Sequence, residues 1–405
     1  MKKNYSFRSF VNILVCLFFS CLFSNFVYCR DHVNLKRAEQ TLEAIYRHYS
    51  APNTCLLRET FPFDDKYTAH YLASEEQAKR SNPYSYLWPF SGTFSAVNAL
   101  YYRTGDKKYQ DMLNNKILKG LEEYFDTGRL PAGYASYINS APVSDRFYDD
   151  NVWLVIDFAD AYLKSGDKSL LDKAQKTWQF VISGWDEQLG GGIYWTEQKK
   201  TSKNTCSNAP SVVAAMKLFK STNNTEYLTT AIKIYEWTKN TLQDSIDYLY
   251  FDNIKQNKRI DKRKYSYNSG QMLQGAALLY KETKDNKYLT DALRLAESCY
   301  NSFFEDYDTG EGENRLLKNE NTWFNAVMFR GFIELYHIDK NKKYVETFRK
   351  NLDCAWEHAR ESNGLFNRDI RGEKKDKTKW LLTQAAMVEM YARMSAIDED
   401  PLEEI

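Results

Sequence analysis

The chain has 405 residues, and its 55 Lys and Arg are almost balanced by 54 Asp and Glu. Because the net charge is near zero and no basic block stands out, we do not expect nucleic acid as a partner. Aromatic residues make up 15% of the chain, including 30 Tyr and 9 Trp. Side chains of this kind fill a core or line a cleft that stacks against the apolar faces of sugars.

Residues 1–29 have the pattern of a secretory signal peptide. Three basic residues within the first eight positions precede a nearly continuous apolar stretch from 10 to 26. This stretch is short for a membrane span and polar sequence follows at once, so we expect cleavage rather than a single N-terminal anchor. Lipid attachment at Cys21 is the alternative to cleavage near Cys29, although Phe19 stands where lipidated sites usually carry a small residue. The mature protein is therefore expected outside the cytoplasm, either secreted, periplasmic or on the cell surface.

A short junction recurs along the chain at nearly constant spacing. It reads YYRTGDKKYQ from residue 101, YLKSGDKSLL from 162, LFKSTNNTEYL from 218, LYKETKDNKYL from 279 and LYHIDKNKKYV from 335. The aligned Tyr109, Leu170, Tyr227, Tyr288 and Tyr344 lie 56 to 61 residues apart, and a period of this size marks a repeated supersecondary unit. Each junction joins two helices through a Gly, Asp or Asn turn, as in an αα-hairpin.

Helical periodicity runs through nearly the whole chain, without the long Val, Ile and Thr alternation typical of strands. The helices that enter the turns are rich in small residues, as a closely packed inner ring requires; they are expected near 88–103, 149–164, 208–220, 268–281, 322–337 and 380–394. The helices that leave the turns, such as 107–124 and 286–303, have a more charged face and suit an outer ring. Six of each predict an all-α, single-domain (α/α)6 barrel over 30–396, followed by an acidic tail over 397–405. An open stack of helical repeats is the alternative.

The short turns all fall at one end of such a barrel, so the long connections must gather at the other end. These connections are expected near 50–87, 126–147, 184–207, 243–267, 304–321 and 361–379. Loops are free to vary, and the N-termini of the inner helices point outward at this end. We therefore predict that the binding site lies on the long-loop face.

Aromatic and amide side chains cluster where the inner helices begin. Such a mixture can both stack against a sugar ring and hydrogen-bond its hydroxyls. Core packing is the alternative for each aromatic residue, and helix capping is the alternative for Asn208 and Asn268. The candidate sugar-binding residues are Tyr148, Asn151, Tyr194, Trp195, Asn204, Asn208, Tyr267, Asn268 and Trp323.

Asp149 and Asp150 stand side by side at the entrance to the second inner helix. Glycoside hydrolysis needs one group to protonate the leaving oxygen and another to capture the sugar, and retaining enzymes place these two carboxyls about 5–5.5 Å apart. Cα atoms of neighbouring residues are about 3.8 Å apart. Their side chains can diverge to the carboxyl separation of retaining enzymes more easily than to the wider separation of inverting enzymes. Two carboxyls this close cannot both ionise easily, so one becomes the proton donor. Helix capping is the alternative role of the pair.

Four of these runs together resemble one known family. They are Tyr148-Asp149-Asp150-Asn151, the Gly-Gly-Ile-Tyr-Trp run that ends at Trp195, the run from Asn204 to Pro210, and Tyr267-Asn268. With them the chain resembles glycoside hydrolase family 76, the endo-α-1,6-mannanases, over most of its mature length. The resemblance implies an (α/α)6 barrel and a retaining mechanism, with Asp149 as the nucleophile and Asp150 as the acid/base. It also implies α-1,6-mannan or its oligosaccharides as the substrate.

Metal and cofactor sites are not expected, because Cys55, Cys206, Cys299 and Cys354 form no Cys-x-x-Cys pair. No obligate protein partner is evident, and we expect a monomer. Two alternatives to hydrolysis use the same cleft, namely a mannan transglycosylase and a mannan-binding protein without catalysis. A sugar epimerase of helical-barrel type is disfavoured because it needs histidines as proton carriers, and none of the five histidines stands at the entrance of an inner helix.

Overall fold

The computed structural model describes residues 33–64, 67, 69, 71, 82–308 and 313–398. The predicted signal peptide over 1–29, with Cys21, lies outside these residues. So does most of the predicted acidic tail, because the last described helix ends at Asp398.

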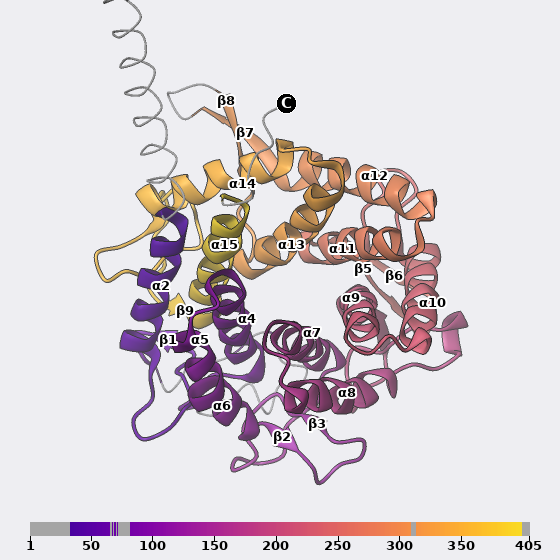
Figure 1. The fold of residues 1–405 in the computed structure, drawn as a ribbon, viewed down its shortest axis with the longest axis horizontal. Coiled ribbons are helices and arrows are strands. Elements are labelled where there is room, and N and C mark those ends of the chain that lie inside the picture. Colours follow the sequence, from indigo (N-terminus) through magenta and orange to yellow (C-terminus); the bar gives the residue numbers. More distant parts are fainter. Residues whose placement is uncertain are drawn as a thin grey trace, which may run out of the picture.

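Six helices of 18 residues each form an inner ring (Figure 1). They are α4 (Leu87–Thr104), α7 (Tyr148–Ser165), α9 (Thr205–Thr222), α11 (Ser266–Thr283), α13 (Thr322–Asp339) and α15 (Leu381–Asp398). The last of them, α15, packs against both α13 and α4, so the ring closes. This closure confirms the predicted barrel and excludes the open stack.

The outer ring alternates with the inner one along the chain and surrounds it in Figure 1. It consists of α2 (Val33–Tyr49), the continuous run α5 (Lys107–Met112), η1 (Leu113–Ile117) and α6 (Leu118–Glu122), then α8 (Lys168–Ile182), α10 (Thr225–Leu242), α12 (Asn286–Phe303), and α14 (Lys343–Cys354) with η3 (Ala355–Ala359). The six inner helices begin within three residues of the positions predicted from sequence, and the two outer helices with predicted bounds, 107–124 and 286–303, begin at the predicted residues. None of the helices in the described part of the chain is both long and apolar enough to cross a membrane.

The short turns that join inner to outer helices share one backbone design. Five inner helices end in a residue with left-handed conformation, at φ between 55° and 73°; these are Gly105, Gly166, Asn223, Lys284 and Lys340. The next helix is capped in four cases by an Asp or Asn side chain that accepts a backbone N–H, from Asp106, Asp167, Asn224 or Asp285. These two devices stop one helix and start the next within a few residues, and they account for the recurring sequence junction.

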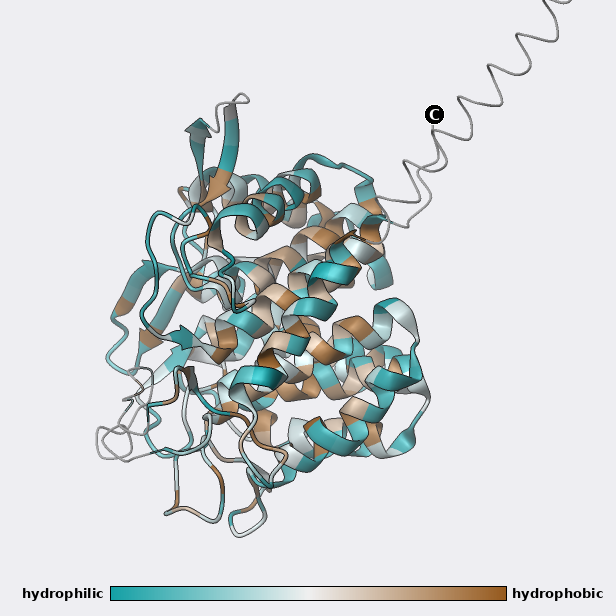
Figure 2. Cartoon of the chain, turned by 90° about the vertical axis from the view of Figure 1, so that its left-hand side faces the viewer, coloured by the Kyte–Doolittle hydropathy of each residue, from teal (hydrophilic) through white to brown (hydrophobic). Residues whose placement is uncertain are grey.

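The long connections carry short antiparallel strands that the sequence did not indicate. These pair as β1 (Thr60–Phe61) with β9 (Lys379–Trp380), β2 (Phe125–Asp126) with β3 (Gly133–Tyr134), β4 (Ser202–Asn204) with β5 (Phe251–Lys255) and then β6 (Ile260–Lys264), and β7 (Phe304–Asp308) with β8 (Glu313–Leu317). Figure 2 shows these strands and the long loops together on one side of the helical ring. The chain therefore has a distinct loop face, as predicted.

The inner helices α11 and α13 cross at two glycines that no other residue could replace without movement. A Cβ added at Gly270 would overlap the Cα of Met328, and one added at Gly331 would overlap the carbonyl oxygen of Gly270. Since backbone atoms cannot rotate aside as a side chain can, these two positions fix how closely the helices approach.

We predict that Gly270→Ala lowers the free energy of unfolding by about 1–3 kcal/mol, because overpacking forces the two backbones apart. Gly275→Ala in the same helix is the matched control, since its added Cβ would meet side-chain atoms alone, the nearest being a Val212 methyl group at 3.0 Å. There the gain in helix propensity, about 1 kcal/mol, offsets the contact. Urea unfolding of both variants measures the difference, and equal effects would contradict this view of the crossing.

Candidate functional site

A cavity of about 640 Å³ opens on the loop face, where the inner helices begin. Five of the six inner helices contribute their second residue to its lining: Trp88, Asp149, Cys206, Tyr267 and Trp323. The remaining lining residues come mainly from the long connections, among them Tyr71, Ser136, Trp195, Asn204, Asp252, Asp261, Arg263 and Tyr265. The repeat therefore delivers the second residue of each of these five helices to the same hollow, and residues of the long connections line much of the rest.

Asp149 lies in this lining with its carboxylate held by three donors. The indole Nε1 of Trp195 donates to Oδ2 at 3.0 Å, and the Cys206 thiol lies 3.3 Å from the same oxygen. The backbone N–H of Asp150 donates to Oδ1 at 3.0 Å. Burial raises the pKa of Asp149 to about 6, while these three hydrogen bonds act in the opposite direction. The donors therefore favour the ionised form of a carboxyl group that burial alone would protonate.

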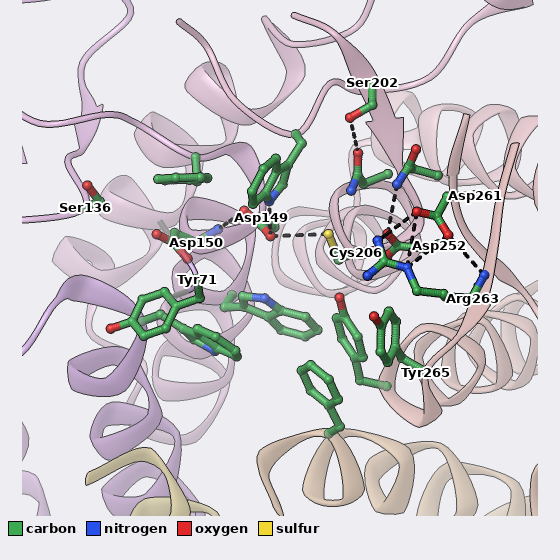
Figure 3. Close-up of a pocket in the computed structure, with 18 of the residues that line it drawn as sticks. Tyr71, Ser136, Asp149, Asp150, Ser202, Cys206, Asp252, Asp261, Arg263 and Tyr265 are labelled. Carbon is green, nitrogen blue, oxygen red and sulfur yellow. Dashed lines mark hydrogen bonds and ion pairs between the residues drawn. The ribbon is translucent and has the colours of Figure 1, made fainter. Parts of the chain in front are cut away.

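Asp150 lies beside it in a different electrostatic environment. Within the described residues its carboxyl group receives no hydrogen bond, and burial together with the neighbouring charge of Asp149 raises its pKa well above the usual range. In Figure 3 both groups face the same hollow, between Ser136 on one side and Cys206 on the other. The hydrogen bonds thus favour the ionised form of Asp149, whereas burial and the neighbouring charge favour the protonated form of Asp150.

Helix capping does not account for the pair. The N-cap residue of α7 is Phe147, which has no side-chain cap. One oxygen of Asp149 accepts the Asp150 N–H, but the other oxygen is bound by Trp195 and Cys206. A capping role would not explain why Asp149 contacts Trp195 in a loop and Cys206 on a second helix.

Four of the predicted sugar-binding residues lie in the cavity lining: Trp195, Asn204, Tyr267 and Trp323. Tyr267 stacks on Phe324 with ring centroids 4.0 Å apart, and Trp88 approaches Trp323 edge-on at 5.4 Å. These rings form an aromatic wall in the lining, with Tyr71 and Tyr265 as further members. Such a wall offers flat apolar surface to sugar rings.

The other predicted sugar-binding residues lie outside the lining of this cavity. Tyr148 is buried against Phe180 of α8, with nearly parallel rings 4.9 Å apart. Tyr194 is buried, donates its hydroxyl to Gln188, and lies under the Lys203 ammonium group. Asn268 is buried beside the Asp252 carboxylate.

Asn151 and Asn208 also lie outside the lining, and both hold loops. The Asn151 amide binds the N–H and the carbonyl of Tyr134, while Asn208 binds the N–H and the carbonyl of Ile193 in the same way. Both side chains are fully buried. Each is the fourth residue of its helix, where it turns away from the cavity and fixes the connection that precedes the helix.

Sequence reasoning missed the polar end of the cavity, on the β5–β6 hairpin. Arg263 donates to both oxygens of Asp261 and lies 3.6 Å from the Asp252 carboxylate. The only sequence signal for these residues was their place in the long connection 243–267, since short strands rich in charge have no clear pattern. Trp88 was likewise not among the predicted site residues.

A second missed feature is a basic residue two positions before four of the inner helices. These residues are Arg146, Lys203, Lys264 and Lys379, and each binds carbonyl or carboxylate oxygens of the preceding connection. Lys203 is completely buried and donates to the carbonyls of Asp186, Gln188 and Gly191 as well as to the Asp186 carboxylate. Because this connection carries Trp195, Lys203 fixes the donor that reaches Asp149. No group of three or more His, Cys, Asp and Glu suited to a metal ion occurs in the described ranges.

We predict that Lys203→Met lowers the free energy of unfolding by about 3 kcal/mol or more, because it leaves buried oxygens without their cation. Activity should fall as well, since the connection that carries Trp195 loosens. Lys200→Met is the matched control, because Lys200 is exposed in the same connection and exposed charges contribute little. Thermal unfolding and initial rates measure both effects, and a Lys203→Met protein as stable as the control would contradict this role.

Comparison with known proteins places the site in context. The model of glycosyl hydrolase family 76 matches residues 60–404. The family 76 mannosidase Bt3792 of Bacteroides thetaiotaomicron is 34% identical, with a TM-score of 0.82 over 90% of this chain and 98% of that one. An α-1,6-mannanase of Salegentibacter sp. HEL1_6, in an inactive variant with two adjacent aspartates replaced and α-1,6-mannotriose bound, is 25% identical, with a TM-score of 0.71 over 90% of this chain and 99% of that one.

Curated relatives match over shorter segments. The mannan endo-1,6-α-mannosidase DFG5 of Saccharomyces cerevisiae is 27% identical over 267 residues, which cover 59% of this chain and 56% of that protein. The chain spans about half the length of the curated relatives it matches, from 42% to 58% for three others.

Proposed function

Since the chain belongs to glycosyl hydrolase family 76, we propose that it hydrolyses α-1,6-mannosidic bonds within mannan chains, with Asp149 and Asp150 as the reacting pair. The observation that carries this proposal is the unequal environment of the two carboxyl groups in one cavity, with three donors on Asp149 and none found on Asp150 in the described chain. The Salegentibacter mannanase supports it, because the inactive variant of that enzyme has two adjacent aspartates replaced.

The reaction follows from the protonation states of the pair. In the first step an Asp149 oxygen forms a bond to the anomeric carbon, the bond from that carbon to the O6 of the next mannose breaks, and Asp150 gives its proton to the departing oxygen. In the second step the Asp150 carboxylate takes a proton from water, the water oxygen bonds to the anomeric carbon, and Asp149 is released. Two displacements at the same carbon return the α configuration.

An endo-acting enzyme needs sugar contacts on both sides of the reacting pair. Figure 3 places Tyr71 and Ser136 on one side of Asp149 and Asp150, and Asp261 and Arg263 on the other. The aromatic wall supplies stacking surface, and the polar residues of the β5–β6 hairpin can bind hydroxyl groups. We therefore propose that the polymer lies along this cavity with its cleaved bond at the pair. The leader-like residues 1–29 support action outside the cytoplasm.

We predict that Asp149→Asn and Asp150→Asn each lower kcat on unbranched α-1,6-mannan by about a thousand-fold or more. An aryl α-1,6-mannobioside separates the two roles, because its phenolate leaves without a proton. On this substrate Asp150→Asn should retain the first step, whereas Asp149→Asn should not. Asp160→Asn is the matched control in the same helix, since Asp160 pairs with Lys217 outside the cavity.

The products identify the reaction. NMR of the first product should show the α anomer before mutarotation, and oligosaccharides rather than free mannose should appear first. With an excess of acceptor sugar, lengthened products would reveal transglycosylation by the same intermediate. Full activity of either Asn variant on mannan, or a first product of β configuration, would refute the proposed roles.

The pH dependence of kcat/KM should be bell-shaped. Asp149 must be ionised, so activity falls as the pH drops through its raised pKa, which lies above the usual carboxyl range. Asp150 must be protonated, so activity falls again as the pH rises through its pKa, which is raised further. With the aryl substrate, Asp150→Asn should remove the alkaline limb and keep the acidic one. An unchanged alkaline limb in that variant would assign the proton to another group.

A further inference from the structure

Two uncharged donors meet on one oxygen of the Asp149 carboxylate. The Trp195 indole and the Cys206 thiol both contact Oδ2, at 3.0 Å and 3.3 Å. Neither residue belongs to α7, which carries Asp149. Trp195 comes from the connection before α9, and Cys206 is the second residue of α9 itself.

Both donors are themselves held in place. The backbone carbonyl of Trp195 accepts the N–H of Tyr148 at 2.9 Å, and the Trp195 ring packs edge-on against Phe147 at 5.1 Å. Cys206 is buried, and Tyr267 of α11 lies beside it. Contacts therefore run from α11 through α9 to Asp149 on α7.

The proposed mechanism requires that Asp149 is charged and Asp150 is protonated. The two aspartates by themselves do not determine which of them holds the proton. Adjacent buried carboxyl groups share their protons, and without further contacts either one could hold the proton. Hydrogen bonds to one carboxylate favour its ionised form and so decide which group is charged. Such bonds also fix the direction in which the attacking oxygen points.

We propose that Trp195 and Cys206 are positioning residues which, by donating to the same oxygen, keep Asp149 as the charged, oriented member of the pair. This inference rests on the proposed function, because it assigns roles within that mechanism. The donors act through Asp149 and need not touch the substrate at the reacting atoms.

The thiol suits this position because it remains neutral. Burial and the charges of Asp149 and Asp252 raise the pKa of Cys206 well above its usual value, so the sulfur keeps its proton. The other titratable groups around Asp149 are Asp150 on the same helix and Tyr267 on α11. A thiolate here would repel Asp149 instead of binding it, whereas a neutral hydroxyl in place of the thiol would preserve the bond.

The acidic limb of the pH profile of kcat/KM tests the proposal. Trp195→Phe keeps the ring but removes the N–H, and should move this limb to higher pH by about one unit, because the ionised form of Asp149 loses a donor. Cys206→Ala should move it in the same direction by about half a unit, since thiols are weaker donors. Cys206→Ser should return it to the wild-type position or below, and a role in packing alone would not produce this rescue.

The outcomes separate this proposal from the proposed function. If Asp149→Asn is inactive on mannan but the acidic limb stays in place in Trp195→Phe and Cys206→Ala, the positioning role is overturned and the mechanism stands. Equal shifts in Cys206→Ala and Cys206→Ser would also overturn the role of Cys206. If Asp149→Asn remains active, the proposed function itself fails. Should Cys206→Ala not fold, Trp195→Phe and Cys206→Ser still decide between these outcomes, with thermal unfolding as the check on stability.

Discussion

Two carboxyl groups on consecutive residues, both half-buried at one rim, cannot both carry charge without a large electrostatic cost. The surroundings of the two groups differ, so that one carboxyl group is favoured in its charged form and the other in its neutral form. Asp149 receives donors from its own helix, from a loop and from α9, whereas Asp150 faces only burial and its neighbour's charge. The chemistry proposed for the cavity depends on this difference, and the rest of the barrel serves to maintain it.

The repeat maintains this difference because residues at equivalent positions of successive repeat units make equivalent contacts. A basic residue two positions before an inner helix, such as Lys203, gathers the carbonyls of the long connection. The second residue of the helix, such as Asp149 or Cys206, enters the cavity. The fourth, such as Asn151 or Asn208, binds the backbone of the preceding loop. The site therefore consists of side chains whose direction is set by the repeat and not by their immediate neighbours.

The sequence was sufficient for the barrel, because a period of 56 to 61 residues and the cap chemistry of the turns are local signals. It also placed Asp149 and Asp150 at the loop face, where both line the cavity. It could not show that Asn151 and Asn208 lie outside the lining, because residues two positions apart on a helix point in nearly opposite directions, about 200° around the axis. A boundary known only to within three residues cannot separate a cavity residue such as Asp149 from a loop anchor such as Asn151. The polar end of the cavity stayed hidden because Asp261 and Arg263 of β6 reach Asp252 of β5 only through strand pairing, which their order in the chain does not reveal.

Trapping the covalent intermediate tests the central claim most directly. A 2-fluoro α-1,6-mannobiosyl fluoride should react once per protein molecule. The fluorine at C2 slows both displacements, but the good fluoride leaving group keeps the first one fast enough for the intermediate to accumulate. Mass spectrometry of the intact protein, followed by peptide mapping, should find one mannobiosyl group attached to Asp149. A label on Asp150 or elsewhere, or an active enzyme that never becomes labelled, would contradict the roles derived from the geometry of the pair.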